Sequence, residues 1–170
     1  RFASYCGISG VTKKEETLAD GAATVAALSA AVTAMDDEEV TATGRYLFIT
    51  PTLLQGINDM DTTKSKKVLE GFEQVIKVPQ RRFYTAIKQL SGKTGEEAGG
   101  YTKATGAANI NFAIVQKDAL IQYTKHAAPK IIAPENNPDA DAYVFGYRMV
   151  GIAKAYKNML SGMYFSHDKA

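Results

Sequence analysis

One stretch of this sequence has the spacing of a long helix with a buried face. Apolar side chains recur at intervals of three and four over residues 18–35, and the alanines between them favour helix and allow close packing. Thr17 is the expected N-cap, and Asp20 suits the positive end of the helix. We therefore expect one helix over residues 18–35, buried along one side.

Most of the remaining chain favours short strands and loops. Residues 45–49 (RYLFI) have the composition of a buried strand, and Thr50 and Pro51 then provide a cap and a first-turn proline for a short helix over residues 52–57. The other expected elements are strands at 71–78, 111–115, 142–156 and 161–166, a polar loop at 58–67, a glycine-rich loop or hairpin tip at 91–108, a short helix at 118–123, and loop or partial strand at 1–16. Residues 81–90 fit either strand or short helix. This pattern predicts an α+β fold.

Charge is unevenly distributed along a chain whose net charge is only +2. Residues 1–62 hold four basic and nine acidic side chains, including the run DDEE at 36–39, for which we expect an exposed turn, with a metal clamp as the weaker alternative. Residues 63–93 hold eight basic and two acidic side chains. This basic block could face solvent, a nucleic acid, or an acidic patch on a neighbouring copy.

Motifs for nucleotide and calcium binding fail on spacing. Gly92, Lys93 and Thr94 resemble the end of a phosphate-binding loop, but Ile87 stands where that motif needs glycine. Asp139 and Asp141 begin like a calcium loop, yet Tyr143 occupies the third ligand position.

The remaining reactive side chains do not form a recognisable site. His126 and His167 are the only imidazoles, 41 positions apart, and we expect His126 to follow a short helix in a structural role. Cys6 has neither histidine near it in sequence, and a single cysteine excludes a disulfide framework within the chain. We therefore assign no catalytic, cofactor-binding or metal-ligating residue, and we expect a protein that is not an enzyme.

The length of the chain, its apolar runs and its first residues further restrict the class of protein. With 170 residues the chain can bury a real core, and no apolar run approaches the roughly 20 residues that a membrane-spanning helix needs. The chain starts at Arg1 rather than Met and has no signal peptide, so we expect a piece of a longer protein or a processed product.

The second half of the chain resembles the major capsid proteins of tailed bacteriophages. The resemblance rests on segments in the order GFE to VP (71–79), RFYT (82–85), GEEAGGY (95–101), INFAIV (110–115), TKH (124–126), PKI (129–131), PDADAY (138–143), YR (147–148) and GMY (162–164). The helix at 18–35 followed by GRYLFITP (44–51) is similar to that family's spine helix and the entry to its axial domain.

This resemblance implies a shell-building protein with the tailed-phage and herpesvirus capsid fold. Residues 1–42 would be a peripheral-domain portion with the spine helix, 43–128 the axial domain, and 129–170 the return strands of the peripheral domain. The implied function is a structural subunit of an icosahedral phage or prophage head, made in the bacterial cytoplasm and assembled into pentamers and hexamers around the packaged DNA. Its partners would be further copies of itself, scaffold and portal proteins, and double-stranded DNA without sequence specificity, but no membrane and no cofactor.

Two alternatives keep part of this interpretation. The same fold would serve a cellular encapsulin-type nanocompartment, and the basic block would serve a nucleic-acid-binding module. Only 17 residues precede the expected helix, too few for the arm and extended loop of the family, so we expect a truncated core. The acidic first third and the basic block are candidate complementary patches, and charge reversal at Lys66 and Lys67 is expected to impair assembly.

Overall fold

The computed structural model describes residues 1–138 and 141–169, and the chain forms two compact units. Unit 1 comprises Arg1–Ala119 and the C-terminal segment that begins at Lys157, whereas unit 2 is Leu120–Tyr156. Unit 1 holds the hydrophobic core, and unit 2 is a two-stranded ribbon.

Unit 1 is built on a mixed five-stranded sheet with the order β1-β9-β6-β2-β3. Its strands are β1 (Thr12–Glu15), β2 (Arg45–Ile49), β3 (Gln74–Lys77), β6 (Ile110–Gln116) and β9 (Met163–His167). β1 is parallel to β9 and β2 is parallel to β3, whereas β6 is antiparallel to both of its neighbours. Because β1 and β9 lie side by side, the sheet needs residues from both ends of the chain.

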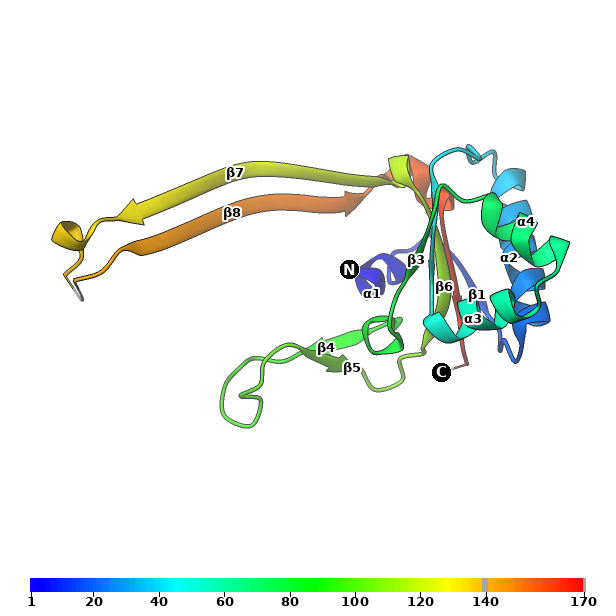
Figure 1. The fold of residues 1–170 in the computed structure, drawn as a ribbon, viewed down its shortest axis with the longest axis horizontal. Helices are drawn as coiled ribbons and strands as arrows, with labels where there is room; N and C mark the ends of the chain where they lie inside the picture. Colours follow the sequence, from blue (N-terminus) through cyan, green and yellow to red (C-terminus); the bar gives the residue numbers. More distant parts are fainter. Residues whose placement is uncertain (139–140, 170) are drawn as a thin grey trace. The chain divides into compact units, whose positions relative to one another are not determined.

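Helices cover both faces of this sheet (Figure 1). On one face lie α2 (Gly21–Asp37), α3 (Pro51–Asp59) and α4 (Thr63–Glu70), and on the other lies the short helix α1 (Phe2–Cys6). The sheet is therefore the middle layer of unit 1.

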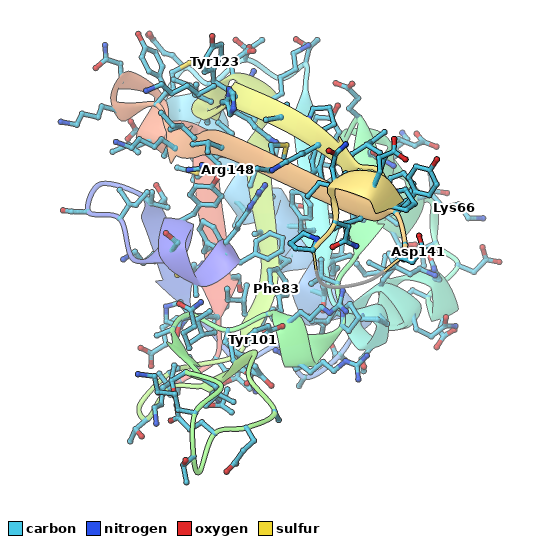
Figure 2. The ribbon with its side chains drawn as sticks, turned by 90° about the vertical axis from the view of Figure 1, so that its left-hand side faces the viewer. Lys66, Phe83, Tyr101, Tyr123, Asp141 and Arg148 are labelled. Atoms are coloured by element: carbon cyan, nitrogen blue, oxygen red, sulfur yellow. The ribbon has the colours of Figure 1, made fainter. Side chains whose placement is uncertain are left out.

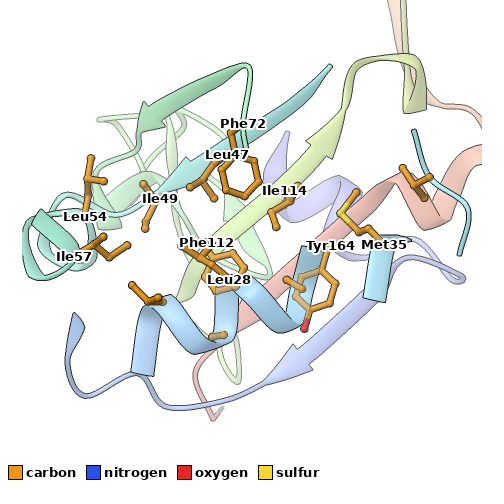
Figure 3. Packing of buried hydrophobic residues seen from close by; sticks show 14 residues of the cluster. Leu28, Met35, Leu47, Ile49, Leu54, Ile57, Phe72, Phe112, Ile114 and Tyr164 are labelled. Carbon is orange, nitrogen blue, oxygen red and sulfur yellow. The ribbon is translucent and has the colours of Figure 1, made fainter. Parts of the chain in front are cut away.

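The main hydrophobic core lies between α2 and the central strands (Figure 3). Leu28 and Met35 of α2 are buried together with Phe112 and Ile114 of β6 and Tyr164 of β9. The rings of Phe112 and Tyr164 are stacked with their centroids 6.2 Å apart. Since each fully buried large apolar side chain contributes about 1.5–3 kcal/mol, this layer is a major source of the stability of unit 1.

A smaller aromatic cluster lies on the opposite face of the sheet. Phe48 alternates with the core residues Leu47 and Ile49 along β2 and therefore points away from α2. Its ring meets Phe2 of α1 edge to face at 5.1 Å, and Phe2 meets Phe83 in the same way at 4.8 Å. These contacts hold α1 and the segment around Phe83 against the sheet.

A buried arginine joins the end of α2 to the start of β2. The Arg45 guanidinium donates hydrogen bonds to Asp36 Oδ1 at 2.7 Å, to the Thr41 carbonyl oxygen at 3.1 Å and to the Val40 carbonyl oxygen. Arg45 is only 2% exposed, and a buried charge without partners is strongly unfavourable. The intervening turn is therefore fixed by this one side chain.

The helix expected at residues 18–35 is confirmed with shifted ends. It begins at Gly21 and Asp20 is its N-cap, accepting a hydrogen bond from the Ala23 amide at 2.7 Å, so the assignment of Thr17 as the cap is wrong. It continues through Asp37, and the expected turn is correspondingly shorter. Both threonine and aspartate side chains can accept a hydrogen bond from a free amide at the start of a helix. In this protein Asp20, three residues after Thr17, does so.

The expected polar loop at 58–67 is wrong, because its second half begins α4. Thr62 accepts a hydrogen bond from the Ser65 amide, and the Ser65 hydroxyl accepts one from the Thr62 amide, both at 3.2 Å. This reciprocal cap starts a helix whose sequence is mostly polar. In the N-terminal segment the expected partial strand is confirmed as β1, whereas the short helix α1 was not expected.

The strands expected at 45–49, 71–78, 111–115 and 161–166 are confirmed as β2, β3, β6 and β9, and the short helix after Pro51 as α3. β3 lies at an edge of the sheet, a position beside which a proline such as Pro79 is tolerated. Residues 81–90 contain the end of a 3-10 turn (Gln80–Arg82) and the strand β4 (Ile87–Gln89).

The glycine-rich segment forms the hairpin that was expected. β4 pairs antiparallel with β5 (Tyr101–Lys103), and the loop between them contains four glycines with φ between 58° and 85°. Side-chain-bearing residues rarely adopt that left-handed conformation, so the glycines permit this loop path.

Unit 2 consists of β7 (Leu120–Ile132) and β8 (Val144–Ala155), which are antiparallel from the pair Leu120–Ala155 to the pair Ile132–Val144. The long strand expected at 142–156 is therefore confirmed. The short helix expected at 118–123 is wrong, because only Lys117–Ala119 form a 3-10 turn and the chain then enters β7.

The close approach of α2 and α3 provides a stability test. A Cβ atom at Gly21 would overlap the Gly56 carbonyl oxygen, whereas a Cβ atom at Gly56 would lie 3.5 Å from its nearest neighbour. We expect Gly21→Ala to destabilise the fold by about 1–3 kcal/mol. The matched control Gly56→Ala should be neutral or stabilising by up to about 1 kcal/mol, since alanine favours helix. Urea unfolding measures both, and equal stability of the two variants contradicts the prediction.

Candidate assembly surfaces

The ribbon of unit 2 exposes an unusual amount of apolar surface. Thirteen large hydrophobic side chains of the described residues are exposed, and eleven belong to this unit: Ile121, Tyr123, Ile131, Tyr143, Val144, Phe145, Tyr147, Met149, Val150, Ile152 and Tyr156. The side chains of both strands project from the ribbon, as Tyr123 and Arg148 show (Figure 2). Large exposed apolar surfaces mark interaction sites, and a lone two-stranded sheet is only marginally stable in water.

Four of these side chains, Ile131, Phe145, Tyr147 and Met149, lie on one face of the outer half of the ribbon. Cross-strand pairs place Ile131 opposite Phe145, Pro129 opposite Tyr147 and Ala127 opposite Met149. Alternate residues of a strand share a face, so these six residues form one surface, which we call the apolar ribbon face. Two contacts along β8 agree with this: the rings of Tyr143 and Phe145 stack at 6.2 Å, and the Tyr147 hydroxyl lies 3.9 Å from Met149 Sδ. Phe145 is 75% exposed and Tyr147 70%.

The opposite face of the outer ribbon is mixed. It carries Lys130, Arg148 and His126 beside Val144 and Val150. The two faces therefore differ in polarity, as expected for a sheet with one face made for burial.

A β-bulge between Thr124 and His126 interrupts the ribbon. On the inner side of it, Tyr123 pairs with Ile152, which lies on the face of β8 that carries Arg148 further out. The exposed apolar side chains thus lie on one face before the bulge and on the other face after it. Because a bulge increases the twist of a ribbon, a surface that covers both groups of side chains must follow that twist.

A second candidate surface is a groove in unit 1, on the face of the sheet opposite α2. A hollow of about 460 Å³ is lined by α1, Phe48, the end of β3, Arg82, Tyr84, Ile87 and Tyr101. A neighbouring hollow of about 410 Å³ shares Arg82, Tyr84 and Tyr101 with it and adds Arg81, Thr102 and Lys103. We call the two together the basic groove, because its lining holds no carboxylate and five cationic residues: Arg1, Lys77, Arg81, Arg82 and Lys103.

Contacts within the chain occupy the aromatic side chains of this groove more than its cations. Lys103 Nζ lies 5.6 Å from the centre of the Tyr84 ring, and the Tyr101 hydroxyl donates to the Arg81 carbonyl oxygen at 3.4 Å. By contrast, Lys77, Arg81 and Arg82 form no ion pair within the described residues. Their charges remain available to an anionic partner.

The acidic run at residues 36–39 has two parts. Asp36 binds the buried Arg45, whereas Asp37, Glu38 and Glu39 are exposed at the end of α2. Within residues 1–138 and 141–169 no three ligating side chains are grouped to hold a metal, so nothing supports the metal-clamp alternative.

The basic block divides between the two faces of unit 1. Lys64, Lys66 and Lys67 lie on α4 in the helix layer, and Lys66 pairs with Asp61 at 2.6 Å. Arg81 and Arg82 lie in the basic groove instead. Residues of the same basic block thus contribute to two separate surfaces.

The other sequence candidates are dispersed. Cys6 is buried in α1, and burial raises the pKa of its thiol. His126 is in the middle of β7, so its expected place after a helix is wrong, and His167 ends β9. Asp139, part of the rejected calcium motif, lies outside the described residues.

The fold resembles that of a phage capsid protein. Over 98% of its length, the chain matches a chain in the capsid structure of the cyanophage P-SCSP1u, with a TM-score of 0.57 and 16% sequence identity. It spans 58% of that chain. No family model matches the sequence, and no curated protein matches it. The α+β, phage capsid-like fold expected from the sequence is confirmed, and at this identity the likeness shows the fold alone.

None of the described helices is long and apolar enough to span a membrane.

The hairpin that borders the basic groove gives a pH prediction. The Glu96 carboxylate accepts hydrogen bonds from Lys88 Nζ at 2.7 Å and from the Ser91 amide at 2.8 Å, and these lower its pKa, the Lys88 bond most. Because the pKa is lower in the folded state, the bonds stabilise the loop above the unfolded-state pKa. That contribution is lost as the pH falls through the folded-state value.

Carboxyl-carbon NMR titration tests this directly. Glu96 should titrate below the ordinary glutamate range, and Lys88→Ala should raise its pKa. Lys93→Ala, which removes a lysine side chain of the same loop, should leave the pKa of Glu96 unchanged. Equal Glu96 titrations in wild type and Lys88→Ala would contradict the assignment.

Proposed function

We propose that this protein is a structural, non-enzymatic subunit of an icosahedral phage head. The observation that carries the proposal is the phage capsid-like fold, which extends over 98% of the chain. The exposed apolar ribbon face supports it independently, because a subunit of a shell has surface that only its neighbours cover.

Assembly would proceed by association of many copies into pentamers and hexamers around the packaged DNA. The apolar ribbon face would be buried against a neighbouring copy, and charged surfaces would set the register of the contact. Scaffold and portal proteins are further proposed partners, and contact with double-stranded DNA would be independent of its sequence. The proposed location is the capsid shell of the virion, after synthesis in the bacterial cytoplasm.

The division into axial and peripheral domains is also a proposal. The expected boundaries at residues 42/43 and 128/129 differ from those of the two compact units. Since α2 packs on β6 and β9, its contacts favour placing it with the sheet rather than in a separate peripheral portion. The ribbon, which contains residues 129–155, is the better candidate for the return strands of a peripheral domain.

Particle formation tests the proposal. The natural reading frame that contains this chain should yield closed, uniform shells when expressed in bacteria, visible by electron microscopy of the purified material. Persistence of the purified protein as a monomer at high concentration, with no shells under any tested salt condition, would contradict it.

Substitutions on the two sides of the outer ribbon test how shells form. Phe145→Ser with Tyr147→Ser removes two rings from the apolar ribbon face. If each is worth about 1.5 kcal/mol or more on burial, particle yield should fall at least tenfold. The matched control is Val144→Ser with Val150→Ser on the opposite face, for which we expect a smaller loss. Equal yields from both double variants would argue against this face as the contact.

A further inference from the structure

The basic groove and the acidic end of α2 lie on opposite sides of unit 1. The groove opens on the sheet face that carries α1 and Phe83, and α2 belongs to the helix layer on the other face (Figure 1). Surfaces placed in this way cannot meet within one unit. They can meet between two copies arranged front to back.

The groove selects an anion. Five cationic residues line it, no carboxylate does, and Lys77, Arg81 and Arg82 are without an ion pair in the described part of the chain. Clustered like charges repel one another, so a negatively charged partner at the groove would be stabilising.

The available groups favour carboxylates over nucleic-acid bases. Binding of single-stranded nucleic acid relies on free aromatic faces as well as cations. Here Lys103 lies over the Tyr84 ring and Phe48 packs edge to face on Phe2, so that Tyr101, 42% exposed, is the one ring of the three with an open face. The cations are thus the freer half of the site.

The exposed acids of this chain supply a matching group. Asp37, Glu38 and Glu39 follow one another at the C-terminal end of α2, where the helix dipole is also negative. They form no ion pair with any described residue, whereas the adjacent Asp36 is bound to Arg45. Negative charge at that helix end is unfavourable, and an external cation would relieve it.

We propose that the acidic residues 37–39 of one copy dock at Arg81 and Arg82 in the basic groove of the next copy. The inference rests on the proposed function, because it names a contact between shell subunits. Two different patches meet, so the interface is head-to-tail, the kind that closes into rings when the rotation allows it. Lys66 and Lys67, on α4, take no part in this contact.

Charge exchange tests the contact. Arg81→Glu with Arg82→Glu, or Asp37→Lys with Glu38→Lys, each places like charges together and should lower shell yield at least about tenfold at low salt. The chain carrying all four substitutions restores opposite charges and should return the yield to within about threefold of wild type. Lys66→Glu with Lys67→Glu is the control for charge change on the helix face. Because Lys66 is paired with Asp61 and both lysines lie on α4, away from the groove, we now expect this change to have little effect, in place of the impaired assembly expected from the sequence.

The outcomes separate this contact from the proposed function. If wild type forms shells and the four-substitution chain assembles no better than the two-substitution chains, the contact is wrong while the proposed function stands. If wild type forms no shells, the proposed function itself fails. Arg81→Gln with Arg82→Gln provides a milder variant, and full yield from it also counts against the contact. Two results together would assign the groove to nucleic acid instead. The protein would bind a short single-stranded oligonucleotide in a salt-dependent way that Arg81→Glu with Arg82→Glu abolishes, and the four-substitution chain would not recover assembly.

Discussion

The packing of α2 across β6 and β9 is the contact on which the rest of unit 1 depends. Leu28 and Met35 bury against Phe112, Ile114 and Tyr164, and the strand that carries Tyr164 pairs with the first strand of the chain. The other face of the same sheet carries the contacts of Phe48 that hold α1 and border the basic groove. Both faces of the sheet therefore have assigned roles: one makes the core, and the other positions a surface.

How far the sequence predicts this fold depends on how local the determining contacts are. The helix at 18–35 could be predicted because its apolar residues recur at helical spacing, although its cap could not. The strand at 45–49 could be predicted because its aromatic and branched residues are typical of a buried strand. The helix α4 could not, because it is polar and starts from a Thr62–Ser65 cap rather than the more familiar threonine–glutamate pair. In the first half of the ribbon, the pattern of apolar residues allowed a helix, and only pairing with β8, up to 35 positions away, decides for a strand.

The candidate surfaces show the same limit. The apolar ribbon face needs the register that sets Ile131 opposite Phe145, and the basic groove joins side chains from Phe2 to Lys103. The charge counts suggested one acidic and one basic patch, whereas the structure divides the basic block between two surfaces. They could not show that Lys66 pairs with Asp61 while Arg82 has no ion pair with any described residue. The structural likeness shows the fold, and the proposed contacts between copies rest on the exposed charges of the basic groove and the exposed rings of the ribbon.

Hydrogen exchange of free subunits and assembled shells tests most directly whether the ribbon is a surface made for burial in a shell. Elements with few buried contacts open locally and exchange early, whereas core strands exchange with global unfolding. We predict slow exchange of β6 amides in both states, and exchange of residues 127–131 and 145–149 that is fast in the free subunit and strongly slowed in the shell. Equal exchange of those ribbon amides in both states would contradict the account.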